Sequence, residues 1–431
     1  MNISRRTFAT TAVAASVAVG AASCGGADKA AEDARSATGP IKIWLSNNEQ
    51  ELAWGKAAVK AWNADHPEEK VTAQEIPAGK SSEEAITAAI TAGTTPDLVF
   101  NISTAASPAW VKQGGLVDLT SFEDGKSYIE QRSGADVAQG YADADGKYYL
   151  LPWKSNPVMV MYNKDLFTKA GLDPEKPGMS TFEDFIAGAQ KIIDKKVAKA
   201  AIWPAPTSEF FQSWFDFYPV YIAQTDGTQL VEDEKATFVS DDGKAVADFW
   251  ASIYEKGLAP KEASTDDAMA TGDTAMQMAG PWAIASYKDA FEVGFMPVPT
   301  ASGSDADKDK TFADSKNVSL FTTSKNQKTA WEFLKFATST EQDGKLLEAS
   351  GQMPLRSDLE KTYADYFAKK PDYARFATLA SRTVDVPNVP NSIEVWQKFR
   401  DAYSSSVIFA KQPVEKALQS AADEIDKLVK G

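Results

Sequence analysis

The chain has 431 residues, with 45 Lys and Arg against 60 Asp and Glu and a formal net charge of −15. Phosphate binding needs a concentrated basic surface, so this charge argues against a nucleic-acid partner. One Cys and one His cannot build an internal disulfide or a four-ligand zinc site. Apolar residues make up 43% and charged residues 24%, which is typical of a folded globular protein.

Residues 1–23 have the layout of an export signal. A positive end at Arg5 and Arg6 precedes a weakly apolar run from Phe8 to Ala22. This run is too short, and too diluted by Thr, Ser and Gly, to predict a membrane anchor. The string SRRTF resembles the twin-arginine export signal, and AASC resembles the bacterial lipoprotein cleavage box without its usual first Leu. We therefore expect Cys24 to carry a lipid, which would consume the only thiol.

Residues 24–40 are small and polar and have no apolar periodicity, so they predict a flexible tether. The sixteen residues from Gly25 to Pro40 would have an r.m.s. span of about 20–24 Å. A folded body on this tether would work close to a membrane without being embedded in it. No later stretch approaches the roughly 18 consecutive apolar residues that a membrane-spanning helix needs.

The folded body begins at Ile41 with alternating strand and helix patterns. The strands are expected at IKIWL, VTAQEIPA and PDLVFNIS, with a helix from Leu52 to Asp65 between the first two. A capping box at Ser81–Glu84 begins a further helix, and Gly93 is placed to end it. Strand and helix patterns in this order predict βαβ units, a mainly parallel sheet and an α/β fold.

Two later helices are predicted by the 3.6-residue period. The segment Ser180–Glu183 caps the first, whose apolar face contains Phe182, Phe185, Ile186, Ala189, Ile192 and Ile193. The second spans residues 329–340, with Trp331, Leu334 and Phe336 as expected core. Asp305–Asp309 superficially resembles a calcium loop, but it lacks the central Gly and the closing Glu, so we interpret it as a solvated loop.

The residues available for catalysis are few. A Ser-His-Asp set would have to use His66, which lies directly before Pro67, and no G-x-S-x-G elbow exists. The sequence has no phosphate-binding loop and no dinucleotide fingerprint. We interpret His66 as a surface residue and expect no cofactor and no metal. Carboxylates are numerous enough for a paired-acid glycosidase, and that alternative stays open.

The aromatic residues point toward carbohydrate. The chain has 11 Trp, 13 Tyr and 22 Phe. Several Trp residues sit beside turn residues, outside clear core periodicity: Trp110, Trp153, Trp203, Trp214, Trp282 and Trp396. A sugar ring offers an apolar face and polar edges, so flat aromatic platforms among amides and carboxylates suit it. The alternative is that these Trp residues are ordinary core.

Four strings carry a family resemblance. They are TTPDLVF at 94–100, MYNKD at 161–165, AMQMAGPW at 275–282 and GQMP at 351–354. Their order and spacing resemble the extracellular solute-binding proteins of bacterial ABC sugar importers, especially the maltose and oligosaccharide branch. The resemblance implies a periplasmic-binding-protein-like fold of type II, in which two α/β lobes with mixed sheets are joined by three crossovers. It places lobe 1 at 41–153 plus 297–338 and lobe 2 at 155–295 plus 340–431. The crossovers are expected near Pro152–Pro157, Gly294–Pro297 and Ala337–Glu341.

The resemblance also implies a function without catalysis. An oligosaccharide or related glycoside would be clamped between the lobes by hinge closure and delivered to the membrane permease subunits of the transporter. The expected location is the outer face of the bacterial cytoplasmic membrane, where the protein acts as a lipid-anchored monomer. Two alternatives remain: an exported carbohydrate-active hydrolase, or the same fold binding a peptide, polyamine or metal chelate.

The resemblance further indicates which aromatic residues bind sugar. Trp282, in AGPW, resembles the stacking Trp of the family. Trp396 follows PNVP where a second platform is found, and Arg400 comes one helical turn later. Trp214 lies in the region that supplies another aromatic wall.

The polar contacts are carried over in the same way. Asn48 and Glu49 occupy the loop after the first strand, and Asn101 and Thr104 follow the PDLVF strand. Asn156 stands where the maltose branch has a Glu. These positions lose several charges of the maltose-type pattern, which favours a different saccharide. Arg356 follows GQMP as a further expected contact; Lys154 and Glu209 are weaker candidates.

Overall fold

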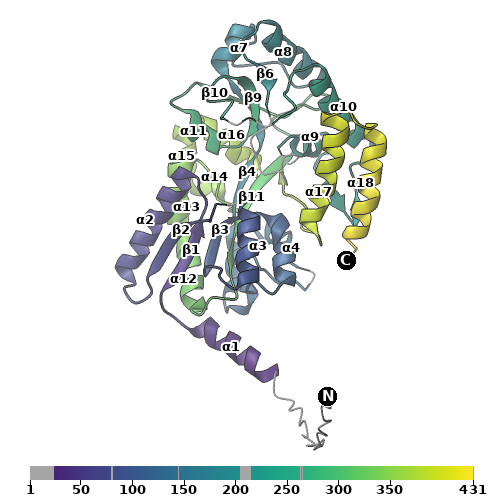
Figure 1. The fold of residues 1–431 in the computed structure, drawn as a ribbon. Helices are drawn as coiled ribbons and strands as arrows, with labels where there is room; N and C mark the ends of the chain where they lie inside the picture. Colours follow the sequence, from purple (N-terminus) through teal and green to yellow (C-terminus); the bar gives the residue numbers. More distant parts are fainter. Residues whose placement is uncertain are drawn as a thin grey trace, which may run out of the picture.

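The computed structural model describes residues 24–78, 81–143, 145–203, 215–262, 264 and 266–430. Two lobes, each built around one β-sheet, lie one above the other in Figure 1. The first sheet contains β1 (Ile41–Leu45), β2 (Val71–Glu75), β3 (Leu98–Ile102), β4 (Leu151–Pro157), β11 (Thr311–Leu320) and β12 (Thr383–Val384). The second contains β5 (Met159–Asn163), β6 (Ala200–Ile202), β9 (Thr274–Ala279) and β10 (Val293–Met296). The α/β prediction is therefore confirmed.

The first sheet has the order β12-β11-β3-β1-β2, with β4 also paired to β11. β1 runs parallel to both β2 and β3, as the βαβ pattern predicted. β11 is antiparallel to β3 and β4, which makes the sheet mixed. The helices of this lobe are α2 (Glu49–Asp65), α3 (Ser82–Ala92), α4 (Ser107–Lys112), α5 (Gly125–Ser133), α6 (Ala135–Gln139) and α12 (Gln327–Ala337), with short turns η1 (Thr104–Ala106) and η2 (Leu119–Ser121).

Local signals fix the helix ends of the first lobe. The Ser81 hydroxyl accepts a hydrogen bond from the Glu84 amide at the start of α3, and Gly93 ends the helix at φ 66°, so both predicted caps are confirmed. Between sheet and helix, Trp54, Phe100 and Trp153 pack with ring centroids 5.1–6.1 Å apart. Trp153 is fully buried, so it belongs to the core.

The second sheet has the order β10-β5-β9-β6. Its helices are α7 (Lys164–Ala170), α8 (Phe182–Asp194), α9 (Phe217–Gln224), α10 (Asp241–Glu255), α11 (Trp282–Tyr287), α17 (Ser392–Tyr403) and α18 (Val414–Leu428), and β7 (Val231–Glu232) pairs with β8 (Lys235–Ala236). A π-helical turn, η4 (Ser404–Ile408), follows α17. Thr181 caps α8 by accepting a hydrogen bond from the Asp184 amide, one residue later than the predicted capping box at Ser180–Glu183. Its apolar face buries Phe185, Ala189 and Ile192.

The chain passes directly from one sheet to the other at Val158, between β4 and β5. The Val158 amide donates to the carbonyl of Phe312 in β11, with 3.0 Å between N and O. The chain returns between β10 and β11. After α12 it forms α13 (Thr340–Ser350), α14 (Leu359–Thr362), α15 (Ala364–Lys369) and α16 (Pro371–Ala380). The exact lobe boundaries and the hinge stay predictions.

The tether prediction is wrong for most of its length, because α1 (Cys24–Ser36) is helical. The segment is rich in Ala, which has the highest helix propensity. The Ser36 hydroxyl donates to the carbonyls of Glu32 and Asp33, at 3.3 and 3.0 Å. Missing apolar periodicity therefore does not exclude a helix here, where high helix propensity is enough.

Across the part of the chain that the structure describes, every helix falls short of the length and apolar character that crossing a membrane requires.

Candidate functional site

Polar side chains gather where the first-sheet strands β1 and β3 end, which is the usual position of ligand sites in α/β sheets. Asn48 and Glu49 directly follow β1, and Asn101 and Thr104 lie at the end of β3. Asn101 has a positive φ of 68°, a conformation that Asn tolerates better than most residues. Glu49 is exposed, whereas the side-chain oxygen of Asn48, Oδ1, caps α2 by accepting from the Glu51 amide at 2.9 Å.

Thr104 is held by Asp385, a residue that we did not single out in the sequence. The Thr104 hydroxyl donates to Asp385 Oδ2 at 2.8 Å, and the Tyr141 hydroxyl donates to the same oxygen at 3.1 Å. The backbone carbonyl of Asp385 accepts from Tyr218 Oη and Gln229 Nε2, each at 3.0 Å. The side chain of Asp385 thus binds first-lobe hydroxyls, while its main chain binds residues of the second lobe.

Burial raises the pKa of Asp385 to about 6, although hydrogen bonds from Thr104, the Val386 amide and Tyr141 oppose the shift. Further charges lie nearby on β11, where Lys316 pairs with Asp314 at 2.7 Å. Burial lowers the pKa of Lys316, but the carboxylates of Asp314, Glu83 and Asp385 raise it overall.

Asp314 thus pairs directly with the Lys316 ammonium, while the carboxyl groups of Glu83 and Asp385 act on it through their charge. Burial raises the pKa of the Glu83 carboxyl, in the first turn of α3. Sequence reasoning missed these groups. The signal available was weak: a polar Asp-Ser-Lys run inside an apolar strand and an acid before Val386-Pro387.

Asn156 lies in a buried polar network that centres on a salt bridge between Glu51 and Lys154. Asn156 Nδ2 donates to Gln352 Oε1 at 3.4 Å, and Asn156 Oδ1 accepts from the Met353 amide at 3.0 Å. Glu51, Lys154 and Asn156 are each 1% exposed. Burial lowers the pKa of Lys154, against the opposing effect of Glu51. Asn156 is thus buried in this structure, and both its Nδ2 and its Oδ1 are hydrogen-bonded within the protein.

On the second lobe, Trp282 begins α11 directly after β9 and is half-buried. Its ring packs edge-on against Phe215, with 6.3 Å between ring centroids. Phe215 in turn packs edge-on against Phe312 of β11, at 5.8 Å. A Cβ at Gly280 would come within 2.1 Å of the indole, so only Gly at this position permits the observed ring position. Trp282 is therefore connected through one ring to the first-sheet strand that carries Asp314 and Lys316.

The assignment of Trp396 as a second sugar platform needs correction, since this residue is 0% exposed. It lies edge-on to Tyr218 at 5.1 Å and shares the core face of α17 with Phe399 and Tyr403. The resemblance was carried over by spacing from PNVP, which says nothing of helical phase. Arg400, on the same helix, pairs with the neighbouring Asp401 at 2.6 Å, and its role with a ligand stays a prediction.

Arg356 is also drawn into the protein interior. It pairs at 3.1 Å with Asp343, which is fully buried and also accepts two hydrogen bonds from Arg132. This network favours a structural role for Arg356. Trp214 and the weaker candidate Glu209 lie outside the described residues.

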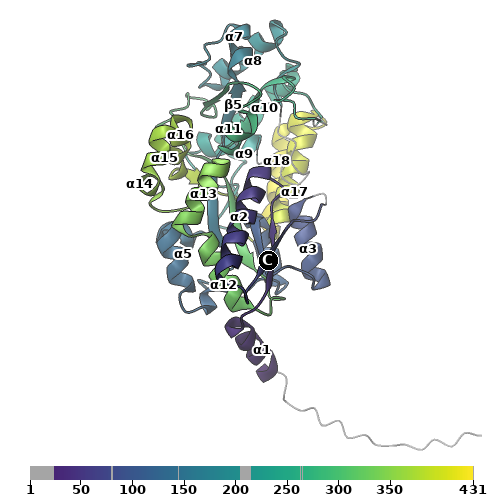
Figure 2. The same ribbon diagram turned by 90° about the vertical axis from the view of Figure 1, so that its left-hand side faces the viewer.

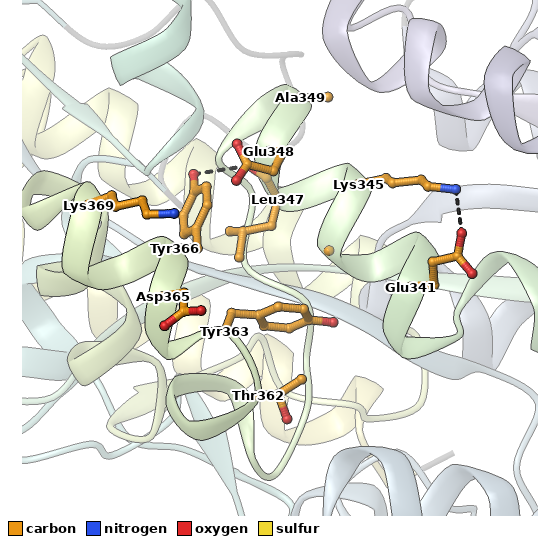
Figure 3. Close-up of a pocket in the computed structure, with 11 residues that line it drawn as sticks. Glu341, Lys345, Leu347, Glu348, Ala349, Thr362, Tyr363, Asp365, Tyr366 and Lys369 are labelled. Atoms are coloured by element: carbon orange, nitrogen blue, oxygen red, sulfur yellow. Dashed lines mark hydrogen bonds and ion pairs between the residues drawn. The ribbon is translucent and has the colours of Figure 1, made fainter.

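A hollow of about 630 Å³ lies between α13 and the helices α14 and α15. Figure 3 shows Tyr363 and Tyr366 at its wall, with an ion pair between Glu341 and Lys345 beside them. None of the predicted sugar contacts lines it. Within the described ranges, no group of three or more His, Cys, Asp or Glu side chains could hold a metal ion.

Comparison with known proteins now adds to this geometry. The family model of bacterial extracellular solute-binding proteins matches residues 46–344. The diacetylchitobiose-binding protein DasA of Streptomyces coelicolor is 28% identical over 407 residues, covering 88% of this chain and 87% of that protein. The maltodextrin-binding protein MdxE of Bacillus subtilis is 24% identical, covering 79% of this chain and 78% of that protein.

Solved structures agree with the fold. The GacH receptor of Streptomyces glaucescens has a TM-score of 0.74 at 21% identity, covering 91% of this chain and 99% of the receptor. A solute-binding protein of Thermotoga lettingae has a TM-score of 0.75 at 21% identity, covering 91% of this chain and 100% of that chain. At this identity the likeness supports the two-lobe fold alone. Because the family model covers well over half of the sequence, this chain belongs to the bacterial extracellular solute-binding proteins.

Proposed function

We propose that this chain is the substrate-binding lipoprotein of an ABC importer and that it captures an oligosaccharide or related glycoside between its two lobes. The family membership supports solute binding. The relatives named above are binding proteins for diacetylchitobiose and maltodextrin, and a relative in Pyrococcus abyssi binds maltotriose. These names share the chemistry of a short chain of hexopyranose units.

The observation that carries the proposal is the connection of an aromatic platform to a strand that carries charged side chains. Trp282 is half-buried on the second lobe, and Phe215 and Phe312 connect it to β11 of the first sheet. Asp314 and Lys316 follow on that strand. An indole face suits the apolar face of a sugar ring, while carboxylates and amides suit its hydroxyl groups.

The lobe division supplies the mechanism that we propose. In the proposed division, lobe 1 comprises 41–153 with 297–338 and lobe 2 comprises 155–295 with 340–431. The strand β4, in which the chain first crosses between them, and β12, which follows the last crossing, both pair with β11. A ligand that contacts both lobes only when they close shifts the population toward the closed form. A membrane permease would then recognise that closed form. In this proposal no bond is broken in the site, and a lipid on Cys24 keeps the monomeric protein at the outer face of the membrane.

Titration of the purified protein with diacetylchitobiose, maltotriose and a panel of other mono- to tetrasaccharides tests the proposal. We expect a saturable change in Trp fluorescence with at least one of them, and a decrease in the radius of gyration by X-ray scattering at saturation. Absence of any response to sugars, together with a response to a peptide or polyamine, would overturn it. Release of a cleaved product from an oligosaccharide would instead support the hydrolase.

A further inference from the structure

The linker that enters the folded body is docked on the first lobe, next to the start of α12. The carbonyl of Ala37 accepts from the Lys328 amide at 3.2 Å. The Gly39 amide donates to the Thr329 hydroxyl at 3.1 Å, and the Asn326 amide group donates to the Pro40 carbonyl at 2.9 Å. Three hydrogen bonds to one helix start thus hold residues 37–40 in place.

Gly39 is the sterically restricted residue in this contact. Its φ is 150°, a conformation that side-chain-bearing residues rarely adopt. A Cβ at this position would come within 3.0 Å of the Asn326 side chain. Asn326 cannot move away freely, because the same side chain donates to Pro40. A larger residue at 39 would therefore break the docking.

The docked linker gives α1 a direction. Both views show α1 leading away from the end of the first lobe that is opposite to the second lobe (Figures 1 and 2). At about 1.5 Å per residue, a helix of this length separates Cys24 from the docked linker by about 20 Å. A flexible tether of similar length would have no preferred direction.

We propose that this linker orients the protein on a lipid surface, with the α12 end of the first lobe facing the bilayer and the second lobe farthest from it. The inference rests on the lipid anchor at Cys24 that belongs to the proposed function. The docked residues 37–40 set the orientation, and α1 acts as a spacer between the lobe and the membrane.

The first test measures the docking without any membrane. Nitroxide labels are placed through Ala30→Cys on α1 and Lys60→Cys on α2, both exposed positions, in a Cys24→Ser background that removes the only native thiol. Pulsed dipolar spectroscopy should give a narrow distance distribution. Gly39→Val should at least double its width, whereas the adjacent control Thr38→Ser should not change it.

The second test uses the lipidated protein in phosphatidylcholine vesicles that carry a rhodamine lipid. A donor dye is attached through Glu68→Cys, beside the docked linker, or through Lys191→Cys on α8 of the second lobe; both positions are exposed. Energy transfer to the membrane should be clearly higher from Glu68→Cys. Gly39→Val should reduce the difference between the two sites.

Equal energy transfer from the two sites overturns the orientation. If the protein with Gly39 intact gives a distance distribution as broad as that of Gly39→Val, the docking of residues 37–40 is wrong. Sugar titration separates these results from the proposed function, because Gly39→Val should bind saccharide with unchanged affinity. If the unaltered protein binds none of the sugars, the proposed function is wrong. The distances between the spin labels would still test the docking, because they do not depend on sugar binding.

Discussion

Removing the indole of Trp282 is the most direct perturbation of the proposed sugar site. The ring is half-buried and packs on one side against Phe215, so part of it remains free to stack on a ligand. Losing such an aromatic anchor typically costs about 1–3 kcal/mol of binding free energy. Trp282→Ala should therefore raise the dissociation constant about 5- to 150-fold.

Gly280→Ala probes the same ring without removing it. The added methyl group would come within 2.1 Å of the indole and must displace it. We expect a loss of affinity in the same direction as for Trp282→Ala but smaller. Phe409→Ala is the matched control, because Phe409 is an aromatic side chain that is 44% exposed and lies outside the proposed site.

Isothermal titration calorimetry with the tightest saccharide of the panel provides the measurement. Thermal unfolding by circular dichroism shows whether each variant is folded at the titration temperature. If folded Trp282→Ala binds with the parent's affinity, the site assignment is wrong, even though the family membership would stand. The same conclusion follows if Phe409→Ala weakens binding as much as Trp282→Ala.

Three further predictions concern stability. Glu51→Leu or Lys154→Met alone leaves an unpaired buried charge and should destabilise the fold by about 3–5 kcal/mol, whereas the double variant should recover most of the loss. The pKa of Asp385 in the folded state, about 6, lies above its ordinary value of 3.8, so its stabilising effect is present below about pH 4 and is lost as the pH rises to about 6. Asp385→Asn should therefore gain stability over the parent by about 1–3 kcal/mol across that window. Gly351→Ala would place a methyl within 2.0 Å of the Tyr373 ring and should cost about 1–3 kcal/mol more than Gly93→Ala, which has the same left-handed φ but open space.

Urea unfolding at fixed pH measures each of these changes in the free energy of unfolding. A double variant at Glu51 and Lys154 that stays as unstable as the single variants would contradict the pairing argument. For Asp385→Asn, a difference from the parent that does not change between pH 4 and pH 6 would show that this carboxyl does not titrate there. If Gly351→Ala and Gly93→Ala lose the same free energy of unfolding, the Tyr373 ring can move away from the added methyl group without destabilising the fold.

Some of these features could be read from local sequence. The capping box at Ser81 and the Gly at 93 depend only on neighbouring residues, and both caps form as predicted. The parallel pairing of β1 with β2 and β3 follows from strand and helix patterns at βαβ spacing. These parts of the fold could be predicted from the sequence because periodicity and helix caps depend only on short segments.

The positions of single side chains were harder to predict from the sequence. Trp282 and Trp396 looked alike in the sequence. In the structure Trp282 is half-buried, whereas Trp396 lies on the fully buried face of α17. The difference is one of helical phase against distant elements, which spacing from PNVP cannot supply. The docked residues 37–40 escaped notice because their partners, Asn326 to Thr329, are nearly 290 positions away in the chain.

The amino-acid sequence by itself determined the α/β class and the order of the strands and helices from β1 to β3. Only tertiary structure decided which acids are brought together. Asp385 meets Thr104 and Tyr141 through contacts across more than 240 positions, and Lys154 meets Glu51 across 103. Such pairs form because burying a charge requires a partner, and the partner is the one that the folded chain places there.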